Sequence, residues 1–275
     1  MRKKMTALNW TALILGLIFL YTPIILVIVY SFNESKLVTV WSGFSTKWYS
    51  DLFEQEGIWS ATKTSLLLAV STSTFAVVLG TMAAFALVKF RRFKGKTLFS
   101  GITYAPMVMP EIIMGSSLGL TFVALKFSTG FFTMMIAHIT FTMCYVVVVV
   151  QSRLTGFDRH IEEAAMDLGA DGIRTFFYIT LPMIFPAIIS GWLLSFTLSL
   201  DDLVIATFTT GPGGTTLPIW IYSKARLGVS PNINALSTLM IGIVATIVFL
   251  VTLINLYLTK RREEDEKNAA KEALS

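Results

Sequence analysis

Long apolar stretches alternate with short polar ones along this chain of 275 residues. A helix needs roughly 20 mostly apolar residues to cross the hydrocarbon core of a bilayer. Stretches of that length lie at about 10–31, 65–88, 98–125, 131–151, 184–208 and 235–258. Little sequence remains outside them, so the pattern predicts an all-α integral membrane protein with six transmembrane helices. We expect a single transmembrane domain, 1–275, and no separate soluble domain.

Composition and charge placement also favour a membrane protein. Hydrophobic residues make up 54% of the chain and charged residues 14%, and the mean hydropathy of +0.69 excludes an ordinary soluble domain. The net charge of +5 is not gathered in one patch, because basic residues lie at the ends of apolar stretches, so nucleic acid is not an expected partner. Six spans put both termini on one side, which holds all but six of the 22 Lys and Arg residues: Lys36, Lys47, Lys63, Lys126, Lys224 and Arg226. The positive-inside rule therefore predicts that both termini are cytoplasmic.

A long polar segment, 153–182, lies on the predicted cytoplasmic side between the fourth and fifth apolar stretches. Asp158 can cap a short helix at its start. Four apolar residues then follow at the i, i+3, i+4, i+7 spacing of one helix face: Ile161, Ala164, Ala165 and Leu168. Three acidic residues fall on the opposite side: Glu162, Glu163 and Asp167.

The second half of this segment repeats the pattern. Gly169 favours a left-handed stop after the first helix, and Asp171 can cap a second helix. The same apolar spacing recurs in four residues: Ile173, Phe176, Phe177 and Thr180. Pro182 is expected to end the run. Helices this short are marginal in water, so two apolar faces predict docking on a partner surface; the alternative is a solvated loop.

Three acidic residues lie within apolar stretches, where a charge costs about 2.5–3.5 kcal/mol on insertion scales. Glu111 lies in the third stretch, and Asp201 and Asp202 lie in the fifth. A cationic substrate would neutralise such acids, so they are candidates for a transport path. Asp202 is the favoured candidate because it shares a small, polar helical stripe with Ser195 and Ser199. Asp201 points about 100° away, and the alternative for both is a structural, hydrogen-bonded carboxylate. For Glu111, which follows Pro110, the alternative is a partial cap on a helix that re-forms after the proline.

The remaining polar and aromatic residues give weaker signals. Trp41, Trp48 and Tyr49 lie in an aromatic outer segment, which is typical of the membrane interface; a cation–π contact with an ammonium is the alternative. His138 and His160 have no metal-ligand neighbours in the sequence, so no metal site is expected. No nucleophile–base pair indicates catalysis. Prolines in the third and fifth stretches predict kinked helices: Pro106, Pro110 and Pro186.

The run EAAMDLGADGIRTFFYITLP, Glu163 to Pro182, resembles the loop by which importer-type ABC-transporter permeases engage their ATPase subunits. With 31–49, 196–208 and 227–239, it makes the whole chain similar to permease subunits of polyamine importers, closest to the putrescine type and next to the spermidine/putrescine type. The resemblance implies a type I ABC importer permease fold in the bacterial cytoplasmic membrane. It also implies a coupling role for residues of the loop: Glu163, Ala164, Ala165, Asp167, Gly169, Ile179, Leu181 and Pro182.

The same resemblance implies a set of partners. These are a second permease subunit, two ATPase subunits, an extracytoplasmic polyamine-binding protein, and a polyamine substrate with putrescine as first candidate. ATP and Mg are expected on the partner subunits. In this chain Gly95-Lys96-Thr97 looks like the end of a P-loop, but the glycine required five residues before Gly95 is Phe90.

A different class of function is a self-contained, proton-coupled secondary transporter of small organic cations that uses Asp201 and Asp202 as a proton relay. Such transporters commonly contain repeated halves, and this sequence has no convincing internal repeat. A purely structural membrane scaffold would leave the intramembrane acids unexplained.

Overall fold

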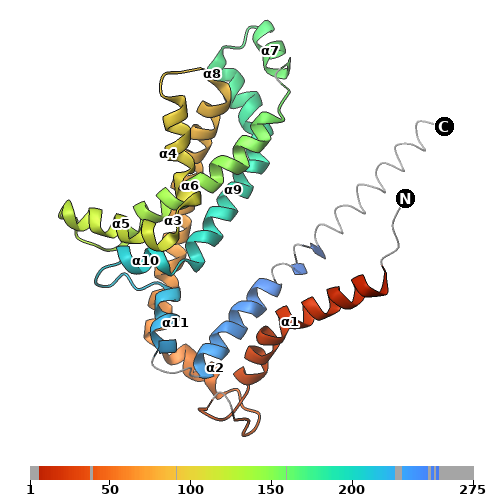
Figure 1. Ribbon diagram of the computed structural model, residues 1–275, viewed down its shortest axis with the longest axis vertical. Helices are drawn as coiled ribbons and strands as arrows, with labels where there is room; N and C mark the ends of the chain where they lie inside the picture. The colour runs from red at the N-terminus through yellow and green to blue at the C-terminus, as the bar shows by residue number, and fades with distance from the viewer. Residues whose placement is uncertain are drawn as a thin grey trace. The chain divides into compact units, whose positions relative to one another are not determined.

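The computed structural model describes residues 6–37, 40–90, 92–158, 160–226, 231–246, 249–250 and 252–253. These residues are almost entirely helical, and their only β-type pairing is the isolated bridge between Asn33 and Phe44. The helices, drawn in Figure 1, are α1 (Ala7–Ser31), α2 (Lys47–Glu54), α3 (Glu56–Lys89), α4 (Lys96–Val108), α5 (Glu111–Ala124), α6 (Phe131–Thr155), α7 (His160–Asp167), α8 (Gly172–Thr175), the π-helix η1 (Phe176–Thr180), α9 (Leu181–Asp201), α10 (Val204–Thr209) and α11 (Leu217–Arg226). By contacts the chain divides into two compact units, unit 1 (Met1–Gln55 with Lys224–Ser275) and unit 2 (Glu56–Ser223).

Four helical segments of the described chain are long and apolar enough to cross a membrane: Leu8–Ser31, Gly57–Lys89, Phe131–Thr155 and Gly172–Asp201. A fifth is possible if α4 and α5 form one bent span. A shorter apolar helix, Pro231–Thr246, covers the start of the sixth predicted span. The end of that span lies outside the described residues, as do several basic residues used to orient the chain: Arg2, Lys3, Lys4, Arg91, Arg159, Lys260, Arg261, Arg262, Lys267 and Lys271. Six helices and cytoplasmic termini therefore stay predictions.

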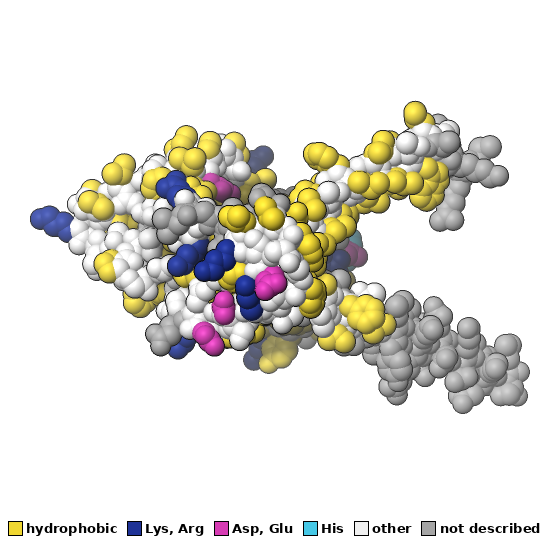
Figure 2. Space-filling view, turned by 90° about the horizontal axis from the view of Figure 1, so that it is seen from below, with side chains coloured by type: hydrophobic (Ala, Val, Ile, Leu, Met, Phe, Trp, Pro, Cys, Tyr) yellow, Lys and Arg dark blue, Asp and Glu magenta, His cyan; other side chains and the backbone are white. Residues whose placement is uncertain are grey.

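Large hydrophobic side chains remain exposed over the described surface, as expected for a protein that faces lipid. They run the length of α1, including Leu15, Phe19 and Ile25. Figure 2 shows such side chains in yellow over much of the face that it views. The hydrophobic stretches are therefore not buried within this chain alone, which fits a multi-pass membrane protein.

The third predicted span, 98–125, is sharply bent, as the prolines within it predict. The axes of α4 and α5 differ by 113°. Pro110 lies at the break, and the preceding residue Met109 has the extended backbone (φ −77°, ψ 136°) that a following proline favours. Pro106 stays inside α4 without ending it, so only one of the two prolines breaks the span.

In the fifth predicted span, 184–208, the first helix, α9, stops before the end of the apolar stretch. It ends at Asp201, Asp202 is extended (ψ 124°), and the short α10 follows. At the other end, Pro182 does not end a separate short helix, because helix continues from Gly172 to Asp201. The turn before the proline is π-helical, and there the Leu181 N–H bonds to the Phe176 carbonyl. Such wider turns let a helix continue past a local disturbance.

The core of unit 2 lies where α3 packs against α6 and α9. Its buried residues are small or branched: Ala76, Ala84, Val146, Val147, Val150 and Ile184. In a second cluster α5 packs against α10 through glycines, where a Cβ on Gly115 would lie 3.1 Å from Ile205 Cα and one on Gly119 would lie 2.6 Å from the Phe208 carbonyl oxygen. Because Gly115 pairs with Ile205 and Gly119 with Phe208, α5 and α10 run in the same direction and begin at the same end.

Gly119→Ala is expected to push α5 away from α10, because the added methyl meets a backbone oxygen that cannot rotate aside. Overpacking of this kind costs about 1–3 kcal/mol, so the thermal midpoint of the purified protein should fall. Intrinsic fluorescence during heating in detergent measures it. Gly101→Ala is the matched control, because nothing lies within 4 Å of its Cβ position. Equal midpoints for the two variants would contradict close α5–α10 packing.

Candidate functional site

The 153–182 segment forms the two-helix corner that its sequence predicts. The Asp158 carboxylate accepts the His160 N–H at the start of α7, and Gly169 follows α7 with a left-handed φ of +90°. The Asp171 carboxylate accepts the Arg174 N–H at 2.7 Å and so caps α8. Within unit 2, α7 and α8 lie at the opposite end from α10 (Figure 1).

Most of the apolar face predicted for α7 is exposed and not packed against unit 2, whereas one residue of the predicted polar side is buried. Of the predicted apolar face, only Ala165 is buried, whereas Leu168 is 91% exposed. Glu162, expected on the polar side, is 7% exposed. The helix therefore places an acidic residue against the rest of unit 2, and its apolar side chains point outward. Ile173 and Tyr178, which follow α7 in the chain, are also exposed, at 72% and 80%.

Glu162 has partners for both carboxylate oxygens. Lys89, at the end of α3, forms an ion pair with Oε2, and Thr180, at the end of η1, donates its hydroxyl to Oε1 at 2.5 Å. Lys89 Nζ also lies 5.9 Å from the centre of the Phe157 ring. The buried acid is thus satisfied by residues from two other elements.

The residues of the predicted coupling loop fall into two groups. Most are exposed: Glu163, Ala164, Asp167, Gly169 and Pro182. Ile179 and Leu181 are half-buried, and Ala165 is buried. Glu163 Oε2 lies 3.2 Å from His160 Nδ1, but both side chains are largely exposed to solvent, so the pair contributes little to stability. Most of these residues are therefore free to contact another molecule.

Asp202 lies in a buried polar cluster rather than on an open surface. At 8% exposed, its carboxylate accepts the Ala206 N–H at 2.8 Å and the Ile205 N–H at 3.4 Å. These are unpaired donors of the first turn of α10, so Asp202 caps that helix. His138 Nε2 lies 3.3 Å from Asp202 Oδ2, although the contact is not aligned as a hydrogen bond.

Ser199 and His138 complete this cluster, which the sequence did not reveal. His138 Nδ1 and the Ser199 hydroxyl are 2.8 Å apart, and both residues are buried. Acid, imidazole and hydroxyl make a nucleophile–base set by composition, but burial keeps any substrate from it. Ser195 is also buried, so the predicted polar stripe of α9 faces the protein interior in this conformation.

Asp201 and Glu111 occupy a different environment from Asp202. Asp201 is the last residue of α9 and Glu111 the first of α5, and both are exposed. Asp201 also lies just before α10, and α5 and α10 begin at the same end of their pair, so the two acids lie toward that end. Glu111 and Asp201 are therefore accessible carboxylates, whereas the carboxylate of Asp202 is buried.

The outer aromatic residues are largely structural. Trp48 is buried and donates its indole N–H to the Asn33 carbonyl at 2.6 Å, and the Tyr49 hydroxyl is 2.7 Å from Ser31 Oγ. Asn33 is buried as well, and its side chain bonds Val40 O and Ser42 N. Trp41 is exposed. Trp48 and Tyr49 thus hold the turn after α1, and of these three candidates Trp41 has the exposed ring.

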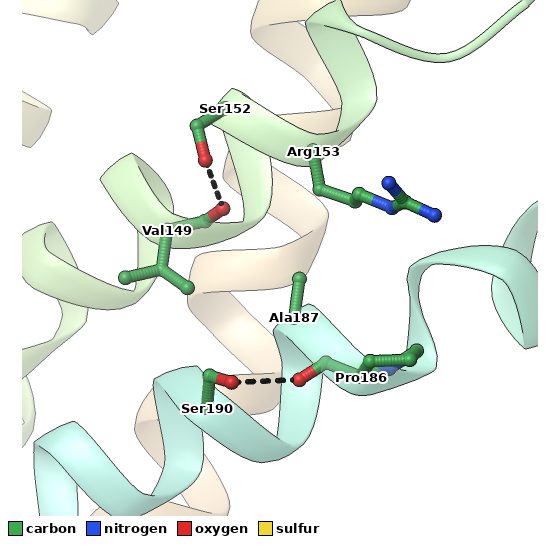
Figure 3. Close-up of a pocket in the computed structure, with 6 residues that line it drawn as sticks. All are labelled: Val149, Ser152, Arg153, Pro186, Ala187 and Ser190. Carbon is green, nitrogen blue, oxygen red and sulfur yellow. Dashed lines mark hydrogen bonds between the residues drawn. The ribbon is translucent and has the colours of Figure 1, made fainter. Parts of the chain in front are cut away.

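A cleft of about 550 Å³ lies between α6 and α9. Its lining residues are shown in Figure 3: Val149, Ser152, Arg153, Pro186, Ala187 and Ser190. The hydroxyls of Ser152 and Ser190 donate to carbonyls of their own helices. The cleft therefore offers apolar walls and one positive charge, Arg153, which does not suit a cation.

Asp202→Ala is expected to lower the thermal midpoint, because two helix N–H groups lose their acceptor and His138 loses its neighbour. Loss of a cap costs about 0.5–2 kcal/mol, and a buried unsatisfied group about 1–3 kcal/mol. Asp202→Asn should keep most of the stability, because Asn is an equally good cap. Thermal unfolding of both variants in detergent provides the measurement. If they lost the same stability, the capping role would be wrong.

Comparisons with known proteins place this geometry in context. Residues 76–264 match the family described as "Binding-protein-dependent transport system inner membrane component". The chain is 52% identical over 263 residues to the "Putrescine transport system permease protein PotI" of Escherichia coli K12, covering 94% of each chain. It is 44% identical over 249 residues to the "Spermidine/putrescine transport system permease protein PotC" of the same strain, covering 90% of this chain and 94% of that protein.

Solved structures show the same fold at low sequence identity. A chain of a bacterial ABC transporter involved in the import of the acidic polysaccharide alginate superposes with a TM-score of 0.68 at 15% identity, covering 91% of this chain and 95% of that chain. A chain of a bacterial alginate ABC transporter in complex with an alginate pentasaccharide-bound periplasmic protein gives 0.68 at 17% identity, covering 89% and 91%. The fold predicted from the sequence, that of an ABC importer permease, is thereby confirmed.

Proposed function

Because this chain belongs to the family of binding-protein-dependent transport system inner membrane components, we propose that it carries a polyamine, with putrescine favoured, as one subunit of an ATP-driven importer. The observation that carries the proposal is the 52% identity to a putrescine permease over 94% of both chains. Identity to the spermidine/putrescine permease is lower, at 44%, and this difference supports the diamine.

The names of the relatives also identify the class of protein. Relatives that align along nearly the whole chain are named as transport permeases, so this is a transporter subunit and not an enzyme. The same relationship favours the importer over the alternative of a self-contained proton-coupled transporter.

We further propose that Glu111 and Asp201 meet the substrate. A diamine carries two ammonium groups, and these two exposed carboxylates lie toward one end of the α5–α10 pair. Asp202, the acid favoured by the sequence, would act behind them by holding α10 in place. The cleft beside Arg153 is not part of this path, because its charge would repel the substrate.

The proposed assembly follows the importer plan. A second permease would pair with this chain in the bacterial cytoplasmic membrane, with six spans and both termini in the cytoplasm. Two ATPase subunits, carrying ATP and Mg, would dock on the 153–182 segment, and an extracytoplasmic binding protein would deliver the polyamine. The exposed apolar residues Leu168, Ile173 and Tyr178 support the docking proposal, because such side chains favour a protein partner over water.

Reconstitution of the four-component complex in proteoliposomes tests the function. With ATP on the ATPase side and loaded binding protein on the other, labelled putrescine should accumulate, whereas vesicles with this chain alone should accumulate none. A proton uncoupler at constant ATP should leave uptake unchanged. Uptake by the lone chain, or collapse with the uncoupler, would favour the proton-coupled alternative. The inhibition of this uptake by unlabelled spermidine shows which of the two polyamines the complex prefers.

A further inference from the structure

The ion pair between Lys89 and Glu162 joins parts of unit 2 that are far apart in sequence. Lys89 ends α3, Glu162 lies in α7, and Thr180 ends η1, and all three meet at one carboxylate. Each oxygen of Glu162 has its own partner, so the orientation of this side chain is fixed by two contacts instead of one.

Burial sets this pair apart from the other ion pairs of the 153–182 segment. The Glu162 side chain is 9% exposed and that of Lys89 21% exposed. The His160–Glu163 and Arg174–Asp171 pairs are both open to solvent, and exposed pairs contribute little. Removing one partner of a buried pair, in contrast, leaves an uncompensated charge.

Few other contacts fix the orientation of α7. The helix has eight residues, too few to be stable in isolation, and its buried residues are Glu162 and Ala165. α3, in contrast, is held firmly, because it packs along both α6 and α9 in the core of unit 2. A displacement of α7 therefore reaches α3 through Glu162 and Lys89, in addition to reaching the Gly172–Asp201 helix through the short chain link that follows α7.

We infer that Glu162 is a positioning residue that ties α7 to α3 and η1 through Lys89 and Thr180, so that these elements move together when the ATPase subunits act on α7. The same tie turns Leu168 outward toward its partner. This inference rests on the proposed function, since it assumes that the 153–182 segment docks an ATPase. It assigns Glu162 a role separate from that of the exposed Glu163.

Glu162→Gln tests the tie in the assembled complex. The substitution keeps the shape of the side chain, and a cavity of about 180 Å³ beside it, lined in part by Lys89, Thr175 and Thr180, can accommodate the change. We expect ATP hydrolysis stimulated by loaded binding protein to fall about tenfold per assembled complex, as for loss of a hydrogen bond to a charged group. The KM for ATP should not change, because the nucleotide site lies on the partner. Lys94→Met, which removes an exposed cation from the neighbouring turn, should stay within about twofold of wild type.

Two further variants separate positioning from simple loss of folding. The charge swap Lys89→Glu with Glu162→Lys restores opposite charges and should recover stimulated hydrolysis to within about threefold of wild type. Thr180→Val removes one donor to Glu162 at nearly constant volume and should give a smaller loss, about threefold. If Glu162→Gln fails to assemble, the charge swap and Thr180→Val test the positioning role of Glu162 in its place.

The outcomes distinguish this inference from the proposed function. Stimulated hydrolysis and uptake at wild-type levels per complex in Glu162→Gln would overturn the tie and leave the importer intact. A loss of assembled complex with unchanged activity per complex would also overturn it, because the role would then be purely structural. Absence of ATP-driven putrescine uptake with the wild-type chain would instead overturn the proposed function.

Discussion

Replacing Leu168 by Asp is expected to release the ATPase subunits from the purified complex while leaving this chain folded. Leu168 is 91% exposed, beside the left-handed Gly169 that ends the α7 turn. Burial of a Leu side chain contributes about 1.5–3 kcal/mol, and a carboxylate in its place would also be desolvated by a docked partner. A total loss of about 3 kcal/mol corresponds to about a hundredfold weaker association. Co-purification of the ATPase with the tagged permease, over a range of concentrations, measures the effect.

The control for this experiment is Leu37→Asp, an equally drastic change at an exposed Leu in the turn after α1. It should leave ATPase retention unchanged. The thermal midpoint of the isolated permease should be the same for both variants, because neither side chain is packed. Full retention of the ATPase by the Leu168 variant would show that docking uses another surface.

The contrast within α7 shows what the sequence predicts and what it cannot. Caps and corners depend on neighbouring residues, so Asp158, Gly169 and Asp171 could be assigned from their positions alone. The direction in which α7 faces depends on Lys89, which is 73 positions from Glu162 in sequence. Helical periodicity predicts the apolar face of α7, and the shortness of the helix predicts that a partner covers it. Neither reveals that Glu162, on the predicted polar side, is buried.

The broken helices illustrate a second limit. Proline permits several outcomes, and in this chain Pro110 breaks a span, Pro106 stays within a helix, and Pro182 follows a π-helical turn in a continuous one. The choice depends on packing, because a freed carbonyl must find a partner within the membrane. Apolar length alone therefore predicts helices over the third and fifth apolar stretches but not the residues at which they break.

The break between α9 and α10 explains why the sequence predicts Asp202 on the transport path whereas the structure buries it. The polar stripe from Ser195 to Asp202 assumed that the helix continues beyond residue 201. In the structure the helix ends at Asp201, and Asp202 turns inward to cap α10. Asp201 is therefore exposed and the adjacent Asp202 is buried, and helical spacing alone does not predict this difference.

The double variant Glu111→Gln with Asp201→Asn is expected to lower putrescine uptake about a hundredfold, because each carboxylate would lose its attraction for one ammonium group. At an effective dielectric constant of about 20, a close pair of unit charges interacts by about 4 kcal/mol before desolvation costs. A net loss of about 1.4 kcal/mol for each acid is a tenfold effect, and the two effects add if the sites act independently. Initial rates of labelled putrescine uptake, at saturating binding protein, measure the single and double variants.

Assembly and stability separate this effect from damage to the fold. Both acids are exposed, so the double variant should retain its ATPase subunits and its thermal midpoint. Asp202→Asn is the matched comparison, since it neutralises the adjacent acid while keeping the cap on α10. Its uptake should stay within about threefold of wild type, because the buried carboxylate does not meet the substrate in this conformation. If Asp202→Asn reduced uptake more than the double variant did, the substrate path would run past Asp202, and the exposed acids would have another role.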